Sequence, residues 1–240
     1  MKKAFTMIEL VFVMVIIAIL SSLAIPNFEQ DRLRQAAEQV VSHIRYTQHL
    51  ALLDNKFQSI SSNPGDIVED KRAQYWYKGS WQIRFLRSAG GTDNEWAYTI
   101  FSDGPNDSVS ASGLDDYNGN PNHTEGEIAS NILNPYNAIT RDGQVLSGGS
   151  AQLDWDSVNA TSSLCIGHKF GIKDMTFTNC LQRIAFDNLG RPIRSLSSLN
   201  DLITLTCRIE LCTIDNCNNA GTSEKITIGI EPQTGYAHIL

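Results

Sequence analysis

The sequence predicts an α+β protein in which one long N-terminal helix precedes a domain rich in antiparallel strands. An apolar run extends from Phe5 to Ile25, and apolar residues at helical spacing continue to residue 52. Beyond residue 80, short segments alternate in polarity or are rich in aromatic and β-branched residues. A helix followed by such strands is typical of the α+β class.

The composition allows a packed core and argues against a nucleic-acid surface. The chain has 240 residues, of which 42% are hydrophobic and 19% are charged. Its formal net charge is −7 and its pI is about 5.2. Domains that bind nucleic acids are usually basic, so we expect no direct nucleic-acid partner.

The apolar segment at the N-terminus has one acidic residue, Glu9, and three interpretations. A secretory signal peptide would explain Lys2 and Lys3, but its apolar region is usually shorter and does not continue into a helix. A plain membrane anchor fits the length, because about 20 apolar residues span a bilayer. A plain anchor leaves Glu9 unexplained, since a carboxylate is expensive to bury in lipid.

The third interpretation accounts for Glu9 through a family resemblance. The segment reads Lys2-Lys3-Ala4, then Phe5-Thr6-Met7-Ile8-Glu9-Leu10, and ends at Ala24-Ile25-Pro26. It resembles the class III prepilin leader and first helix of type IV pilins and type II secretion pseudopilins. The chain departs from the family pattern at Ala4, where Gly is usual.

The resemblance implies a route of processing and assembly. Prepilin peptidase is expected to cut between Ala4 and Phe5 and to methylate the new amine of Phe5. Glu9 would then face that amine, in its own or a neighbouring subunit, and set the register between apolar helices. The alternative is that Glu9 lies at the lipid headgroups.

The same resemblance divides the chain into four parts. We expect a cleaved leader at 1–4, a transmembrane and assembly helix at 5–26, the amphipathic half of that helix at 27–55, and a β-rich periplasmic domain at 56–240. The chain would cross the bacterial inner membrane once, with its N-terminus in the cytoplasm, and would later enter a pilus or pseudopilus. Its expected partners are prepilin peptidase, the inner-membrane assembly platform, other pilin or pseudopilin subunits and, before assembly, membrane lipid.

The second half of the helix has an apolar stripe that predicts contact with a sheet. The stripe consists of Leu33, Ala36, Ala37, Val40, Val41, Ile44, Gln48, Ala51 and Leu52, with charged residues between them. A coiled-coil arm is the alternative. Pro26 removes a helical hydrogen bond and predicts a kink, and residues 54–56 should end the helix.

Strands are expected throughout the remainder of the chain. Residues 80–87 and 96–101 predict a hairpin with Gly90 and Gly91 in its loop. Further strands are expected at 151–155, 164–168, 182–187, 202–211 and 225–230, with a closing strand at 236–240. Residues 103–127 are dense in Asp, Asn, Gly, Pro and Ser, which predicts a loop. A long helix packed on an antiparallel sheet is also the pilin fold that the resemblance implies.

Two features are similar to the minor H-type pseudopilin. One is the set Arg45, Gln48 and Ala51 on adjacent helical turns, and the other is a Phe-Asp-x-x-Gly-Arg-Pro turn at residues 186–192. A hairpin turn explains the second feature equally well, because Asn188 and Gly190 suit turns on their own.

All five cysteines follow residue 160, and disulfides are permitted outside the inner membrane. Cys212 and Cys217 bracket a short loop and could close it, in which case Cys165 and Cys180 would pair. Cys207 lies on an alternating apolar face and is expected in the core. Four cysteines allow three pairings, and the spacing does not select one. The rival interpretation is a zinc site that uses Cys207, Cys212, Cys217 and His168.

Metal and catalytic signals are weak. Hard oxygen donors at Asp115, Asp116, Asn118 and Asn120 make calcium the candidate cofactor, although the loop is not an EF-hand and a solvated loop is the alternative. The sequence has no phosphate-binding glycine loop, Gly-x-Ser-x-Gly or His-Glu-x-x-His. We therefore expect neither an enzyme nor a bound organic cofactor.

Three functions remain open. The first is a structural minor pilin or pseudopilin. The second is a pilus-tip subunit that binds or adheres through a loop at 103–140. The third is a membrane-anchored periplasmic binding protein or enzyme that only imitates the leader.

Overall fold

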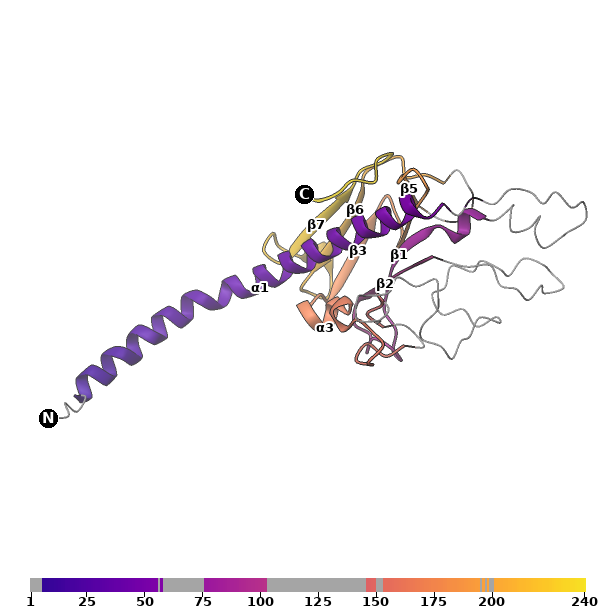
Figure 1. The fold of residues 1–240 in the computed structure, drawn as a ribbon. Coiled ribbons are helices and arrows are strands. Elements are labelled where there is room, and N and C mark those ends of the chain that lie inside the picture. The colour runs from indigo at the N-terminus through magenta and orange to yellow at the C-terminus, as the bar shows by residue number, and fades with distance from the viewer. Residues whose placement is uncertain are drawn as a thin grey trace, which may run out of the picture.

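The computed structural model has one long helix and two four-stranded antiparallel sheets (Figure 1). It describes residues 6–55, 57, 76–102, 146–149, 153–194, 196, 198 and 201–240, without the side chains of residues 22–30. The α+β class is thus confirmed, but the strands form two sheets rather than the single sheet that the sequence suggested.

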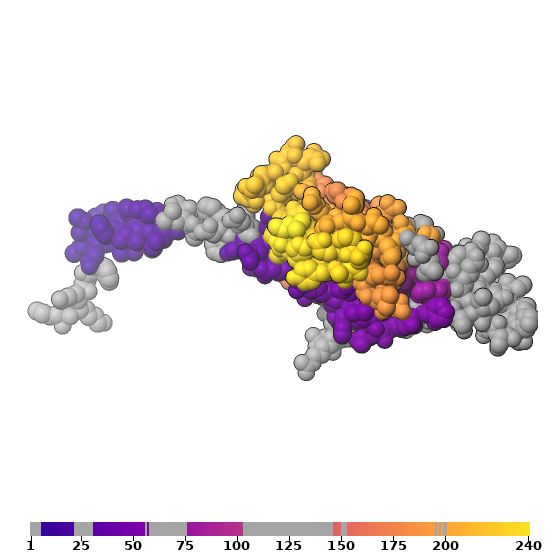
Figure 2. All heavy atoms as spheres, turned by 90° about the horizontal axis from the view of Figure 1, so that it is seen from above, coloured from indigo at the N-terminus to yellow at the C-terminus, as the bar shows by residue number. Residues whose placement is uncertain are grey.

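The long helix α1 spans Met7–Leu53 and is continuous through position 26. The loosening expected at Pro26 therefore does not end the helix. Its C-cap is Asp54, whose backbone N–H bonds to the Leu50 carbonyl oxygen at 3.0 Å, so the helix ends where the sequence predicts. The first part of α1 projects away from the globular body (Figures 1 and 2).

The first sheet has the order β2-β1-β4-β5, and the second has the order β3-β6-β7-β8. The strands of the first sheet are β1 (Trp81–Leu86), β2 (Ala97–Ser102), β4 (Arg183–Phe186) and β5 (Pro192–Ile193). Those of the second are β3 (Asp174–Thr178), β6 (Cys207–Cys212), β7 (Lys225–Ile230) and β8 (Ala237–Ile239). Short helices occur at Trp76–Gly79 (η1), Ser162–Leu164 (η2), Ile166–Phe170 (α3) and Cys217–Asn219 (η3).

Several predicted strands are confirmed. The hairpin pairs β1 with β2, with Trp81 opposite Ser102. The predictions at 182–187 and 225–230 coincide with β4 and β7, and the closing strand is β8. The strand predicted at 202–211 begins later, at Cys207, and β3 and β5 were not predicted.

Two strand predictions are wrong. Residues 164–168 fall in η2 and α3, because a short apolar run does not distinguish a strand from a buried helix. Gly171, at φ 75°, ends α3 in the left-handed conformation that glycine adopts freely. In the predicted strand 151–155, Leu153 forms only an isolated bridge and the chain turns at residue 155.

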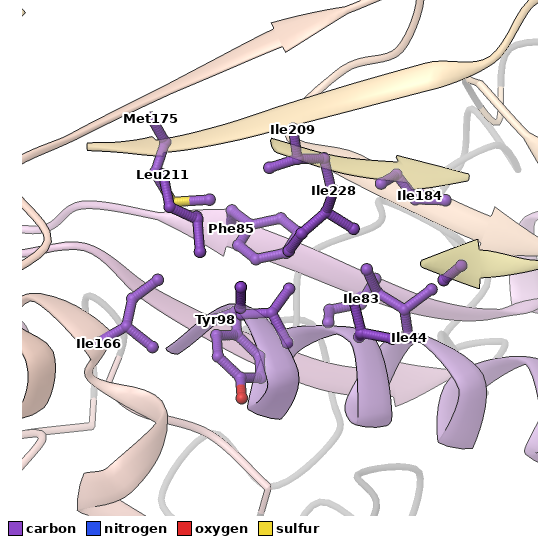
Figure 3. Close-up of a cluster of buried hydrophobic side chains, with 14 of the residues drawn as sticks. Ile44, Ile83, Phe85, Tyr98, Ile166, Met175, Ile184, Ile209, Leu211 and Ile228 are labelled. Atoms are coloured by element: carbon purple, nitrogen blue, oxygen red, sulfur yellow. The ribbon is translucent and has the colours of Figure 1, made fainter. Parts of the chain in front are cut away.

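The main hydrophobic core of the described residues lies between α1 and both sheets (Figure 3), with two small clusters outside it. Ile44 of α1, Ile83 of β1 and Ile228 of β7 are fully buried and show that the helix contacts each sheet. The predicted apolar stripe supplies the helical side of this core, except that Leu52 is 52% exposed and Gln48 is half-buried. The stripe therefore packs within the domain and does not form a coiled-coil arm.

Candidate functional site

The first turn of α1 is closed by a reciprocal contact between Thr6 and Glu9. Thr6 is the N-cap, and its hydroxyl accepts from the Glu9 N–H at 3.4 Å. The Glu9 carboxylate reaches back and accepts from the Thr6 N–H at 3.3 Å. This is a capping box, in which two of the unpaired N–H groups at a helix start find acceptors. The carboxylate therefore points toward the N-terminal end of the helix.

The sequence analysis did not identify Thr6, although its signal was present. Thr-x-x-Glu immediately before an apolar run is a sequence signature of a capping box. Ala4 and Phe5, the predicted cleavage and methylation residues, lie outside the described residues, so their predicted roles remain predictions.

Residues 7–20 of α1, which follow the cap, expose large apolar side chains on every side. The exposed residues are Met7, Ile8, Leu10, Val11, Phe12, Val13, Met14, Val15, Ile16, Ile17, Ile19 and Leu20. Their exposed fractions range from 44% at Ile16 to 87% at Met7. Glu9 is the charged residue in this stretch, 7–20. Counting described residues alone, no helix is both long enough and apolar enough to span a membrane.

The other end of α1 is fixed to the domain by side-chain amide and guanidinium groups. Gln48 Nε2 donates to the carbonyl oxygens of Gly190 at 2.8 Å and Thr234 at 2.7 Å. Arg45 donates from Nε and Nη2 to the Ala237 carbonyl oxygen at 3.0 and 2.8 Å. These bonds connect the helix to the turn after β4 and to the hairpin between β7 and β8.

The turn after β4 is rigid in its own right. Asp187 is 7% exposed, and its Oδ1 accepts from the backbone N–H groups of Leu189 and Arg191 at 3.0 and 2.8 Å. Its Oδ2 pairs with Arg191 Nε at 2.7 Å. Gly190 has a φ of 76°, and a Cβ atom there would lie 3.0 Å from Gln48 Nε2. The two features noted in the sequence, at residues 45–51 and 186–192, are therefore parts of one contact.

The cysteine pairing differs in part from the prediction. The structure confirms the disulfide between Cys212 and Cys217. Cys180 pairs with Cys207, 27 residues away, and not with Cys165, so the predicted pair Cys165–Cys180 is wrong. The register explains the change: β3 and β6 are antiparallel neighbours with Thr178 opposite Arg208, so Cys180 lies near Cys207. These disulfides occupy the three sulfurs that the rival zinc site would need.

Cys165 is left as a free and fully buried thiol. Burial raises its pKa to about 11, with smaller contributions in the same direction from Glu95 and Asp93. A thiol with such a pKa is almost entirely protonated at neutral pH and is a poor nucleophile. Cys165 therefore acts as a core residue.

Metal ligands are not gathered in the part of the chain that the structure describes. No group of three or more His, Cys, Asp and Glu residues there could hold an ion. The candidate calcium donors Asp115, Asp116, Asn118 and Asn120 lie outside the described residues, so calcium binding stays a prediction.

Comparison with known proteins bears on the first 25 residues. They match the family model of the prokaryotic N-terminal methylation motif. This match supports a class III prepilin leader at the N-terminus. It supports the type IV pilin and pseudopilin family, as the resemblance implied. No curated protein and no solved structure matches the chain.

Proposed function

We propose that the chain is a structural subunit, a minor pilin or pseudopilin, of a type IV pilus or type II secretion pseudopilus. Prepilin peptidase removes residues 1–4 and methylates Phe5. Residues 5–26 hold the subunit in the inner membrane, with the globular domain in the periplasm. The assembly platform then transfers the subunit into a fibre, in which α1 packs among the helices of other subunits.

One observation carries this proposal: α1 exposes apolar side chains on every side from Met7 to Leu20. A helix that is apolar all round needs either lipid or neighbouring helices around it. Because the same helix continues unbroken into the domain, whatever binds its first half also positions the domain.

Glu9 gives the apolar helix one charged group that can form a specific contact with another part of the assembly. Its carboxylate already turns toward the N-terminal end, through the bond to Thr6 N–H. Cleavage after Ala4 creates a cationic amine at Phe5, one residue before Thr6. A buried carboxylate is tolerated when it is paired, so Glu9 can neutralise this amine within its own chain or in a neighbour.

Two substitutions at Glu9 test the pairing and separate it from capping. Glu9→Ala removes the charge and the side-chain half of the capping box that Glu9 supplies, whereas Glu9→Gln keeps a side chain that can complete a capping box and removes only the charge. Both variants should enter the membrane and fold. Neither should be incorporated into fibres when the companion subunits are wild type. Incorporation of Glu9→Gln at the wild-type level would assign Glu9 to capping alone, and normal incorporation of both would overturn the proposal.

A second candidate function, a pilus-tip binding subunit, is favoured by the charge of one insertion. Residues 103–145 hold seven acidic residues against the single basic residue Arg141, a net charge of −6 out of −7 for the chain. The described residues that flank this segment lie beside each other, because Ile100 N–H of β2 bonds to the Leu146 carbonyl at 2.9 Å. Such an acidic insertion suits a cationic partner surface better than DNA.

A further inference from the structure

A half-buried polar network joins α1 to β2 and to the segment 162–170, which contains η2 and α3. At its centre is the hydroxyl of Tyr98, which is fully buried. His43 Nδ1 lies 2.6 Å from this hydroxyl, and Gln39 Nε2 lies 2.8 Å from it. Gln39 also donates to the Ser163 carbonyl at 2.8 Å and accepts from Lys169 Nζ at 3.2 Å.

The partners of Gln39 determine where the hydrogens lie. A carbonyl can only accept, and an ammonium can only donate, so Nε2 must face Ser163 and Oε1 must face Lys169. Gln39 therefore donates its second amide hydrogen to the Tyr98 oxygen. The Tyr98 hydrogen is then free to point at His43 Nδ1, which accepts it as the unprotonated nitrogen of a neutral imidazole.

A proton on His43 conflicts with this arrangement. Nδ1 would become a donor, and the hydroxyl hydrogen of the fully buried Tyr98 would lose its acceptor. Among the described residues, the charged group that faces His43 is Lys169 of α3, whose like charge opposes protonation; β2 contributes neutral Tyr98 and η2 contributes the Ser163 carbonyl. Burial, and secondly Lys169, lower the pKa of His43.

We propose that this network is a pH-sensitive latch: neutral His43, through Tyr98 and Gln39, helps to hold residues 162–170 against α1, and its protonation weakens that hold. The segment is short and its ends are fixed independently, so it can open locally, although opening must expose the buried side chains of Leu164, Ile166 and Phe170. Thr161 N–H bonds to the Ser147 carbonyl at 2.9 Å, and Lys173 N–H bonds to the Cys212 carbonyl at 2.8 Å. The sheets and both disulfides lie outside it.

The sign of the effect follows from the lowered pKa. The folded state binds fewer protons at His43 than the unfolded state, so the latch is fully closed above the ordinary histidine range. It weakens as the pH falls through the folded-state pKa. The steepest change, up to about tenfold per pH unit, falls between the ordinary histidine pKa and the lowered folded-state value, and below the latter the effect levels off because His43 is then protonated in both states.

Amide hydrogen exchange on the full chain in detergent micelles tests the latch. After correction for intrinsic exchange rates, the amides of Lys169 and Gly171, bonded within α3, should lose about tenfold in protection between pH 7 and pH 5. The amides of β6 and β7 should not change. His43→Gln should abolish the response, while exposed His49→Gln on the same helix should leave it intact.

A further control is needed because α3 carries its own histidine. His168 stacks on Trp155 and lies 3.5 Å from Asp93 Oδ2, so His168→Gln must retain the response. The proposal is overturned if the wild-type protection is independent of pH, or if His168→Gln rather than His43→Gln removes the response. Should His43→Gln fail to fold, NMR titration of the wild type decides: the α3 amides must titrate with the midpoint of the His43 ring.

Discussion

Gln48 and Gly190 lie 142 residues apart in the chain, and a 2.8 Å hydrogen bond joins the Gln48 side-chain amide to the Gly190 carbonyl oxygen. The same amide reaches the Thr234 carbonyl, so one side chain of α1 connects two turns from different sheets. This contact therefore fixes the position of α1 relative to both sheets.

Replacing Gln48 by Ala should destabilise the domain. The Gly190 and Thr234 carbonyls lose their donor, and because the site is half-buried, water can replace it only in part. We expect a loss of about 1–2 kcal/mol in the free energy of unfolding, measured by urea titration with circular dichroism. His49→Ala, at the exposed neighbouring position, is the control and should change stability by less than about 0.5 kcal/mol; equal effects at the two positions would contradict the assigned contact.

The close approach at Gly235 gives a second prediction. Gly235 has a φ of 66°, and a Cβ atom there would lie 2.5 Å from the Gly190 oxygen and 2.6 Å from Gln48 Nε2. Gly171 has a similar φ of 75°, but a Cβ atom there would meet nothing within 4 Å. Both Ala substitutions carry the left-handed strain of about 1–2 kcal/mol.

Only Gly235→Ala adds a steric clash that separates Gln48 from its acceptors. Its unfolding free energy should therefore fall by about 1–3 kcal/mol more than that of Gly171→Ala. Thermal unfolding of the two variants side by side measures the difference. If Gly171→Ala were as damaging as Gly235→Ala, backbone strain alone would explain both effects.

Long-period patterns in the sequence predicted the fold better than short ones. The helical stripe from Leu33 to Ala51 recurs over five turns, and it identified the buried face of α1 correctly. The sequence of β7, Lys225–Ile230, alternates in polarity and is bounded by turn residues, although its burial does not alternate. Residues 164–168 carry too few positions to separate the period of a helix from that of a strand.

Contacts between distant segments could not be read from local patterns. The partner of Cys180 depends on the pairing of β3 with β6, and the strand β3 was not predicted. The division of the strands into two sheets likewise depends on which strands are neighbours. The order of the strands in the sequence does not determine this. At the N-terminus, Glu9 was identified through its spacing from Phe5, whereas its cap partner Thr6 was overlooked although the capping-box pattern was local.

The cysteine pairing makes a prediction that does not depend on activity. Peptide mapping without reduction should recover Cys180 linked to Cys207 and Cys212 linked to Cys217. Cys165, buried and with a raised pKa, should react with an alkylating reagent only after unfolding. Rapid labelling of Cys165 in the folded chain, or its recovery in a disulfide, would refute this assignment.

Loss of the longer disulfide should lower stability more than loss of the shorter one. Cys180–Cys207 closes 27 residues and Cys212–Cys217 closes five, and closing a longer loop restricts the unfolded chain more. We expect Cys180→Ala/Cys207→Ala to lose about 2–4 kcal/mol, by the same urea titration. Equal losses from the two double variants would argue that strain or packing, not chain entropy, determines the effect.

Shortening the acidic insertion separates a structural role from a binding role. The Gly148 N–H bonds to the Tyr98 carbonyl at 3.0 Å and Thr99 forms a bridge with Ser147, so residues 146–148 continue the sheet beside β2. A replacement of residues 103–145 by about six Gly and Ser residues should preserve this pairing. Thermal unfolding of the shortened chain measures whether the domain keeps its stability.

Fibre incorporation of this shortened chain then discriminates the two functions. A purely structural subunit should assemble and support its machine as the wild type does, because α1 and its contacts are unchanged. A tip-binding subunit should assemble but lose attachment to its partner, since about six of the seven net negative charges are gone. A matched variant that keeps the length but replaces the seven acidic residues with Asn or Gln separates charge from size: if it binds normally, the acidic character is not what the partner recognises.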